Sequence, residues 1–323
     1  MPLPLEEPGE ALLISASRKA MAGEFEIDLN AGQYPQGTER ALDALDEITR
    51  LEEKLSFFRP NSMVSYLNAV AAAEPVAIDD ELFQLLDACL ELWHATNGAF
   101  DVTATPLWET WGFARRDGRL PSEAEIAAAR ESVGCDALKI DKSAQTVRFL
   151  KPGLRLNFGA AGKGYALDMA ARSLRDGGID DFLMHGGLSS VLACGTQKND
   201  SGTAGWRVGV AHPMRRGQRL RELRLIDRAV GTSGTQQQFF HHRGKRYGHI
   251  LDPRTGWPAD KLLGVTVLAP SALLADALST AFFVMGPEAA LAYCAAHEEI
   301  AALLTVPVRR GCGYEILEAG EIP

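Results

Sequence analysis

Apolar residues recur at three- and four-residue steps in several stretches of the chain, which is the spacing of an amphipathic helix. In residues 38–57 this spacing is regular, and Thr38 is placed to cap the first turn. A second helix is predicted to begin at Asp79 or Asp80 and to end at the Asn-Gly pair 97–98, a typical helix end. Further helices are expected at 122–132, at 271–285 and after Pro287.

Alternating apolar and polar residues predict β-strands in other segments. Strands 11–17 and 24–30 are joined across residues 21–23, and 138–140 with 146–149 reads as a hairpin. Further strands are expected at 182–185, 191–195, 206–210, 223–226, 247–250 and 265–268. Helices therefore dominate the first half and antiparallel strands the second, which predicts an α+β fold rather than regular βαβ alternation.

The chain of 323 residues is long enough to bury roughly three quarters of its unfolded surface. Residues 1–10 are expected to form a flexible tail, and the polar segment 196–205 a flexible loop. We expect 11–323 to form a single domain, with two sub-domains and a cleft between them as an open alternative.

The segment 154–168 combines a predicted short strand, a run of small residues and a predicted helix. Leu154 and Leu156 alternate with polar residues, and glycine and alanine then occupy most positions from 159 to 164. In a strand-turn-helix of this kind, the unpaired N–H groups of the turn and of the first helical turn point toward one position. Lys163 would add a positive charge there. The Walker and dinucleotide-binding spacings are both absent. A phosphate site and a tight turn without a ligand therefore both remain open.

Three other segments carry residues suited to chemistry. Asp276 and Thr280 lie four residues apart on an apolar predicted helix, so they share one face and offer the oxygen ligands that Mg²⁺ prefers. The alternative is that Asp276 is a helix cap or an ion-pair partner. His249 ends a predicted strand before the turn 252–256, either as a working imidazole or as a brace for the turn. The segment 98–103 and the aromatic residues after it are suited to a pocket for a flat ring, or to plain core.

Composition limits the class of ligand and the compartment. A net charge of −9 argues against nucleic acid and against anionic membranes, so a phosphate must be held by local cations, a metal or backbone dipoles. The five cysteines are scattered and never spaced C-x-x-C, which is typical of reduced thiols. The acidic N-terminus lacks the apolar core of a signal peptide, and no apolar run approaches ~18 residues. These features predict a cytoplasmic protein without membrane insertion.

Four motifs, taken together and in order, resemble the FAD:protein FMN transferase family, the ApbE-like flavin transferases. The resemblance extends over about residues 15 to 285. The motifs are Gly-Ala-Phe-Asp-Val-Thr at 98–103, the glycine-rich turn and Lys-Gly-Tyr-Ala-Leu-Asp at 159–168, His-Ile-Leu-Asp-Pro-Arg-Thr-Gly at 249–256, and Ala-Asp-Ala-Leu-Ser-Thr-Ala at 275–281.

The resemblance implies an ApbE-like α+β fold, with a helical first half packed on a mainly antiparallel sheet and the glycine-rich strand-turn-helix at the nucleotide site. It implies that the protein binds FAD with Mg²⁺ and moves the FMN half to a Ser or Thr of an acceptor protein, releasing AMP. By motif position, the implied metal ligands are Ala160 (through its carbonyl), Asp276 and Thr280, and the implied catalytic residues are His249 and Asp276. The residues assigned to the nucleotide are Met21, Ala99, Phe100, Asp101, Asn157, Gly162 and Lys163.

The chain departs from the family pattern at several places. Asn157 stands where the family has Asp, and 184–190 lacks an Asp and an Arg of the usual motif. The residues from Thr235 to Gln238 stand where the family commonly has Tyr-x-Arg, and Gly248 replaces a Ser before His249. Two further hypotheses therefore stay open: an FAD pyrophosphatase that uses water as the acceptor, and an FAD-binding protein without catalysis.

Overall fold

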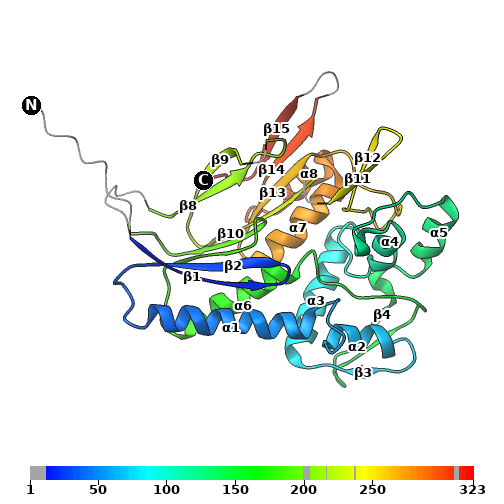
Figure 1. Cartoon of the computed structure of the whole chain (residues 1–323), viewed down its shortest axis with the longest axis horizontal. Coiled ribbons are helices and arrows are strands. Elements are labelled where there is room, and N and C mark those ends of the chain that lie inside the picture. The colour runs from blue at the N-terminus through cyan, green and yellow to red at the C-terminus, as the bar shows by residue number, and fades with distance from the viewer. Residues whose placement is uncertain (1–11, 199–203, 216, 236–237, 309–312) are drawn as a thin grey trace, which may run out of the picture.

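The structure is a computed structural model that describes residues 12–198, 204–215, 217–235, 238–308 and 313–323. Its centre is an eight-stranded sheet in the order β1-β2-β6-β7-β10-β13-β14-β15, in which all neighbours are antiparallel (Figure 1). The strands are β1 Leu13–Ala20, β2 Gly23–Asn30, β6 Phe182–Gly186, β7 Ser190–Cys194, β10 Arg228–Gly234, β13 Gly264–Ala269, β14 Ala301–Pro307 and β15 Tyr314–Ala319. The predicted flexible tail and residues 199–203 of the predicted loop lie outside the described residues.

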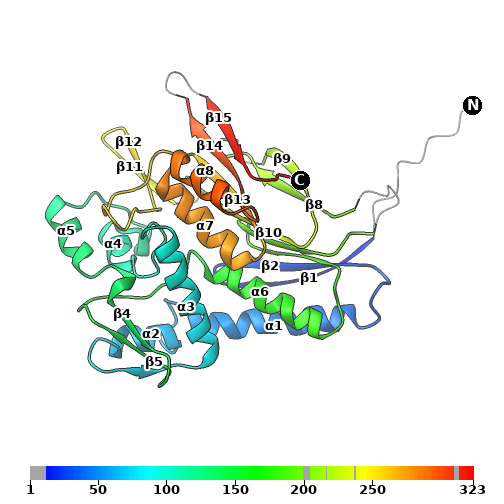
Figure 2. The ribbon, with the colours of Figure 1, turned by 180° about the vertical axis from the view of Figure 1, so that it is seen from behind.

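Four helices cover one face of this sheet, as Figure 2 shows from behind. They are α1 Gly37–Leu55, α6 Gly162–Asp176, α7 Ala272–Met285 and α8 Pro287–Ala296. Side chains of β2 point alternately to the two faces of the sheet. Phe25, Ile27 and Leu29 are buried on one face, whereas Glu26 and Asp28 on the other face are partly exposed. On the opposite face, the hairpin of β8 Trp206–Ala211 and β9 Arg219–Leu225 buries Trp206 and Leu223.

The cyan and green segment between α1 and α6 forms a smaller, mainly helical body at one end of the sheet (Figure 1). Beside it stands the hairpin of β11 Phe239–His242 and β12 Lys245–Gly248. The elements of the smaller body are α2 Met63–Val70, β3 Val76–Ala77, α3 Asp80–Ala95, α4 Thr105–Thr110, η1 Phe113–Arg115, α5 Glu123–Glu131, η2 Cys135–Ala137, β4 Leu138–Asp141 and β5 Thr146–Phe149.

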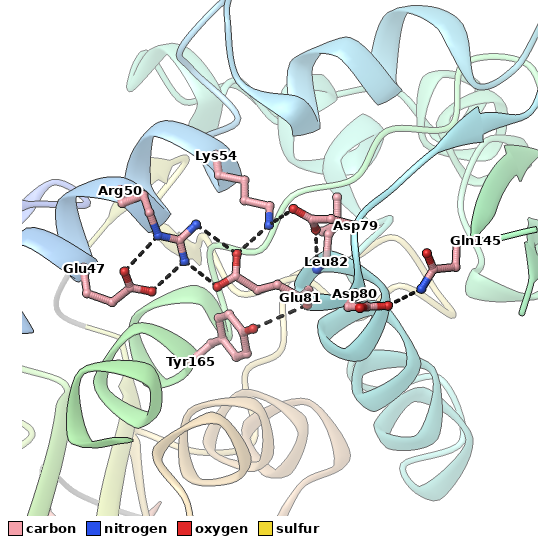
Figure 3. Close-up of polar contacts among 9 residues, drawn as sticks. All are labelled: Glu47, Arg50, Lys54, Asp79, Asp80, Glu81, Leu82, Gln145 and Tyr165. Carbon is pink, nitrogen blue, oxygen red and sulfur yellow. Dashed lines mark hydrogen bonds and ion pairs between the residues drawn. The ribbon is translucent and has the colours of Figure 1, made fainter. Parts of the chain in front are cut away.

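An ion-pair network fixes α3 against α1 and α6 (Figure 3). Lys54 on α1 lies 2.5 Å from both Asp79 and Glu81 at the start of α3, and Arg50 lies 2.5 Å from Glu81. The hydroxyl of Tyr165 on α6 donates to the backbone carbonyl of Glu81 at 3.4 Å. Isolated surface pairs contribute little, but several charges sharing partners hold these helices in one arrangement. Since α3 leads into residues 98–103, the network also positions that segment.

The antiparallel α+β prediction is confirmed, and so are most of the predicted helices and strands. The strand predicted at 154–156 is wrong, because only Arg155 forms an isolated bridge, to Ala104. The backbone of Leu156 instead bonds with both ends of the Asn68 amide, at 2.7 and 3.0 Å. The strand predicted at 247–250 ends at Gly248, one residue before His249. No helix in the described segments is long and apolar enough to cross a membrane.

Candidate active site

A cavity of about 310 Å³ lies where the glycine-rich turn, α7, the segment after α3 and the segment after β12 meet. Most of the residues assigned from the sequence line it, although they are distributed over nearly the whole chain. These lining residues are Ala99, Phe100, Asp101, Asn157, Ala160, Lys163, His249, Asp276 and Thr280.

Asp276 is the most deeply buried charged group of this cavity. Its Oδ2 accepts hydrogen bonds from the backbone N–H of Gly164 and from the hydroxyl of Ser190, both at 2.8 Å. Burial raises its pKa to about 7, although the charge of Lys163 and these two hydrogen bonds act in the opposite direction. No described residue donates a hydrogen bond to Oδ1, so one carboxylate oxygen remains available to a ligand in the cavity.

Hydroxyl groups from three parts of the chain also line this cavity. The ammonium of Lys163 donates to the hydroxyl of Ser189. The hydroxyl of Ser233 on β10 lies 2.8 Å from that of Ser279 and 3.2 Å from that of Thr280 on α7. Together with the Asp276 carboxylate, these hydroxyl oxygens form a set of possible ligands for a hard cation. The hydroxyls add no further negative charge.

Close contact between backbones sets the position of Asp276. A side chain at Gly164 would place its Cβ 2.1 Å from the carbonyl oxygen of Ala272, and one at Gly231 would place it 2.3 Å from that of Ala275. Asp168 reinforces the contact, because its carboxylate accepts the N–H groups of Ala272 and Leu273 at 2.8 and 2.9 Å. Helices α6 and α7 and strand β10 can approach this closely only where glycine leaves room.

Asp101 braces the wall of the cavity through four hydrogen bonds. Its Oδ1 accepts from the N–H and hydroxyl of Thr103, at 2.7 and 2.5 Å, and from the thiol of Cys135 at 3.2 Å. Its Oδ2 accepts from the indole of Trp93 at 3.0 Å. Burial raises the pKa of this carboxyl group. The carboxylate thus holds the segment 98–103 in shape, and Asp101 is itself among the residues that line the cavity.

His249 follows β12 and is held in one orientation. Its Nδ1 lies 3.0 Å from the carbonyl oxygen of Gln238. A carbonyl oxygen only accepts, so in the neutral ring Nδ1 carries the proton and Nε2 has the free lone pair. Burial lowers the pKa of the imidazole, which favours the neutral form near neutral pH. This is the state that a proton acceptor requires.

The profile of the ApbE family matches residues 21–304. The chain belongs to the ApbE family. The chain is 28% identical over 292 residues to the FAD:protein FMN transferase of Haemophilus influenzae, covering 87% of this chain and 83% of that protein. It is 31% identical over 260 residues to the enzyme of that name from Vibrio cholerae, covering 78% and 76%. The crystal structure of the ApbE protein from Thermotoga maritima superposes with a TM-score of 0.83 at 30% identity, covering 94% of this chain and 96% of that one.

The ApbE resemblance read from the sequence is therefore confirmed, while two of the assigned nucleotide residues lie away from the cavity lining. Met21 lies in the β1–β2 turn at φ 48° and packs against the main core. Gly162 is the first, buried residue of α6, where an added Cβ would meet only Phe158, at 3.5 Å. Their roles stay predictions. Within the glycine-rich turn, Gly164 is the glycine whose missing side chain allows the close contact with α7.

The sequence reading missed several lining residues of this ApbE site. Ser189 lies where the chain departs from the family pattern, so no role could be assigned to it from the sequence. Phe58 was missed as well, and it lies in the cavity lining with its ring centroid 6.3 Å from that of Trp108, one of the aromatic residues that the sequence did suggest for a pocket. Two of the hydroxyl residues that were given no role, Thr232 and Ser233, come from β10, a strand that the alternation did not predict.

A second group of ligand-type side chains lies away from this cavity, on the sheet. Glu26, Asp28 and His185 place one ligand atom each within 4.8 Å of one another, on β2 and β6. They are partly exposed, and Asp28 already accepts a hydrogen bond of 2.5 Å from Ser15. They are not among the cavity-lining residues.

Proposed function

We propose that this ApbE-family protein transfers the FMN half of FAD to a Ser or Thr hydroxyl of an acceptor protein, with Mg²⁺ as cofactor and AMP as the other product. The main support is the convergence of Asp276, Lys163 and His249 on one cavity from three distant parts of the chain. The relatives named FAD:protein FMN transferase support the choice of substrate.

The oxygen donors around Asp276 fit Mg²⁺. The carboxylate is buried, one of its oxygens is free of protein donors among the described residues, and the hydroxyl of Thr280 lies on the same face of α7. Asp276 and Thr280, with the carbonyl of Ala160, are the residues proposed to hold the ion. Bound there, the ion would neutralise charge on the pyrophosphate.

The proposed reaction is the attack of the acceptor oxygen on the FMN phosphorus. A new P–O bond forms to the acceptor, and the P–O bond of the anhydride breaks, so AMP leaves with that oxygen. Nε2 of His249 accepts the proton of the attacking hydroxyl. Lys163, whose ammonium donates to Ser189, lines the cavity and would add positive charge beside the phosphates, while the buried Ala99 and Phe100 would limit the access of water.

The test uses the purified protein with FAD and Mg²⁺, with and without a purified candidate acceptor. Transfer predicts acceptor-dependent AMP together with flavin fluorescence that stays with the acceptor in a denaturing gel. AMP and free FMN formed equally without an acceptor would instead identify a pyrophosphatase. FAD binding without AMP in either sample would identify a binding protein and contradict the proposal.

A further inference from the structure

A basic surface stands beside the cavity of this acidic protein. It consists of the loop 113–119 and the hairpin β11–β12, which projects above α4 in Figure 1. The whole chain has 33 Lys and Arg against 42 Asp and Glu. These two segments instead hold a single acid, Asp117, and the cations Arg115, Arg116, Arg119, Arg243, Lys245 and Arg246.

These cations are exposed and mostly without a counter-charge. Arg119 pairs with Glu125 at 2.8 Å, but the other five form no ion pair with any described residue. Arg246 stacks its guanidinium 3.8 Å from the ring centroid of Phe239, and His241 and His242 are exposed on the same hairpin. The surface therefore concentrates positive charge on a chain whose net charge is negative.

The two segments are joined by an aromatic base that continues to His249. Gln238 donates to the carbonyl of Phe113 at 2.8 Å, and Phe113 lies 5.8 Å from Phe240 between ring centroids. Phe240 stacks on Tyr247 at 5.3 Å, and Phe113 lies 6.4 Å from the His249 ring. The basic surface thus packs next to His249, the residue proposed to take the acceptor's proton.

The β11–β12 turn does not itself require a positively charged residue at its tip. Arg243 and Gly244 form a two-residue loop with φ of 49° and 79°, between the paired residues His242 and Lys245. Such a loop favours Asn, Asp or Gly at its first position, because other side chains are strained there. An arginine at that position disfavours the turn and places a cation at the tip.

FAD is not the partner that the geometry favours for this surface. None of the six cations is among the cavity-lining residues, which already include one cation, Lys163. Both basic segments nevertheless adjoin the cavity, since Trp108 precedes the loop on α4 and His249 follows the hairpin. A macromolecule that inserts one hydroxyl into the cavity must lie on the surface around it, and these two segments adjoin the cavity there.

We propose that this basic surface docks an acidic segment of the acceptor protein and so delivers the target hydroxyl to the cavity. The proposal rests on the proposed transfer function. Complementary charge would make this surface select an acidic segment. It also increases the association rate of the two proteins. Binding through it must weaken as salt is raised, because exposed charges are screened.

The direct test measures binding of a fluorescein-labelled peptide of ten glutamates, by anisotropy at low salt, against the same length of glutamine. The variant combines Arg115→Gln, Arg243→Asn and Lys245→Gln. We expect at least a fivefold weaker affinity for the glutamate peptide. Arg243→Asn suits the turn better than arginine, so the thermal midpoint should not fall. Loss of binding would then not be caused by unfolding of the hairpin.

The matched control is Lys139→Gln with Arg148→Gln, two exposed cations opposite each other on the β4–β5 hairpin. The control should change the peptide affinity less than twofold. Equal effects of the two variants would overturn the docking site. Tighter binding of a single-stranded DNA oligomer or of phosphatidylserine vesicles to the same residues would overturn the assignment to an acceptor protein.

Failure of this inference can be distinguished from failure of the proposed function. AMP release from FAD and Mg²⁺ and the affinity for FAD are measured in the same proteins. We expect the FAD affinity of the triple variant to match that of the wild type, and a fall in it would assign the cations to FAD. If no acceptor tested yields AMP even with the wild type, the proposed function fails whatever the peptide binding shows.

Discussion

The carboxylate of Asp276 on α7 accepts a hydrogen bond of 2.8 Å from the backbone N–H of Gly164 in the first turn of α6. From the sequence, the glycine-rich turn could either offer its N–H groups to a bound phosphate or be a tight turn without a ligand. One of them is instead used by the protein's own carboxylate, and the N–H of Gly162 bonds to the carbonyl of Phe158. The positive end of α6 therefore stabilises the ionised form of Asp276, a residue that burial alone would keep protonated.

The first prediction concerns the contact between the two helices. Gly164→Ala should lower the free energy of unfolding by roughly 1–3 kcal/mol and displace Asp276, because the new Cβ meets the backbone of Ala272 rather than a movable side chain. Gly162→Ala is the control, since its Cβ makes only an ordinary contact of 3.5 Å. Urea unfolding of both variants is the measurement. Equal losses would show that close approach at Gly164 is not what the fold requires.

The second prediction concerns the proposed metal ligand. Asp276→Asn keeps an oxygen to accept from Gly164 and Ser190, but it removes the charge that holds the ion, so AMP release should be lost. The pKa of about 7 in the folded state lies above the ordinary 3.8, so ionising this group at higher pH destabilises the fold. At pH 8 the metal-free variant should therefore be more stable than the wild type, by on the order of 4 kcal/mol. Undiminished AMP release would refute the assignment.

The third prediction separates chemistry from binding at His249. His249→Gln can still donate to the carbonyl of Gln238, but it has no basic nitrogen, so the rate should fall ~10²–10⁴-fold with the affinity for FAD nearly unchanged. Single-turnover AMP release and an FAD titration give the two quantities. If rate and affinity fall in equal proportion, the histidine only braces its turn. Because burial lowers the imidazole pKa, the wild-type rate should decline only as the pH falls below 6.5.

The fourth prediction concerns stability against pH. Burial raises the pKa of Asp168 to about 6 from 3.8, so between these values the folded protein binds more protons than the unfolded chain. The contribution of this group to stability is therefore present at acid pH and is lost as the pH rises through about 6. Asp168→Asn should remove a change on the order of 2–3 kcal/mol between pH 4 and 6.5 in metal-free protein. Parallel stability curves for wild type and variant would contradict this.

Local sequence patterns determined much of this protein without any tertiary information. Helices α1, α3 and α7 and the antiparallel pair β1–β2 follow directly from side-chain period, and the Asn97-Gly98 end of α3 has the expected left-handed backbone. These elements could be predicted because each depends on interactions within a few residues. The ordered motifs likewise sufficed for the ApbE family.

Tertiary structure decided what the local patterns could not. Leu154 and Leu156 alternate like a strand, yet the side chain of Asn68, 88 residues from Leu156, supplies the hydrogen bonds that a neighbouring strand would have provided. Gly162 and Gly164 look equivalent in the sequence, and only the carbonyl of Ala272 distinguishes them. The pKa of Asp276 is likewise set by burial and by Lys163, Gly164 and Ser190, which lie on α6 and β7. It could not be predicted from the local sequence, because the fold brings these groups together.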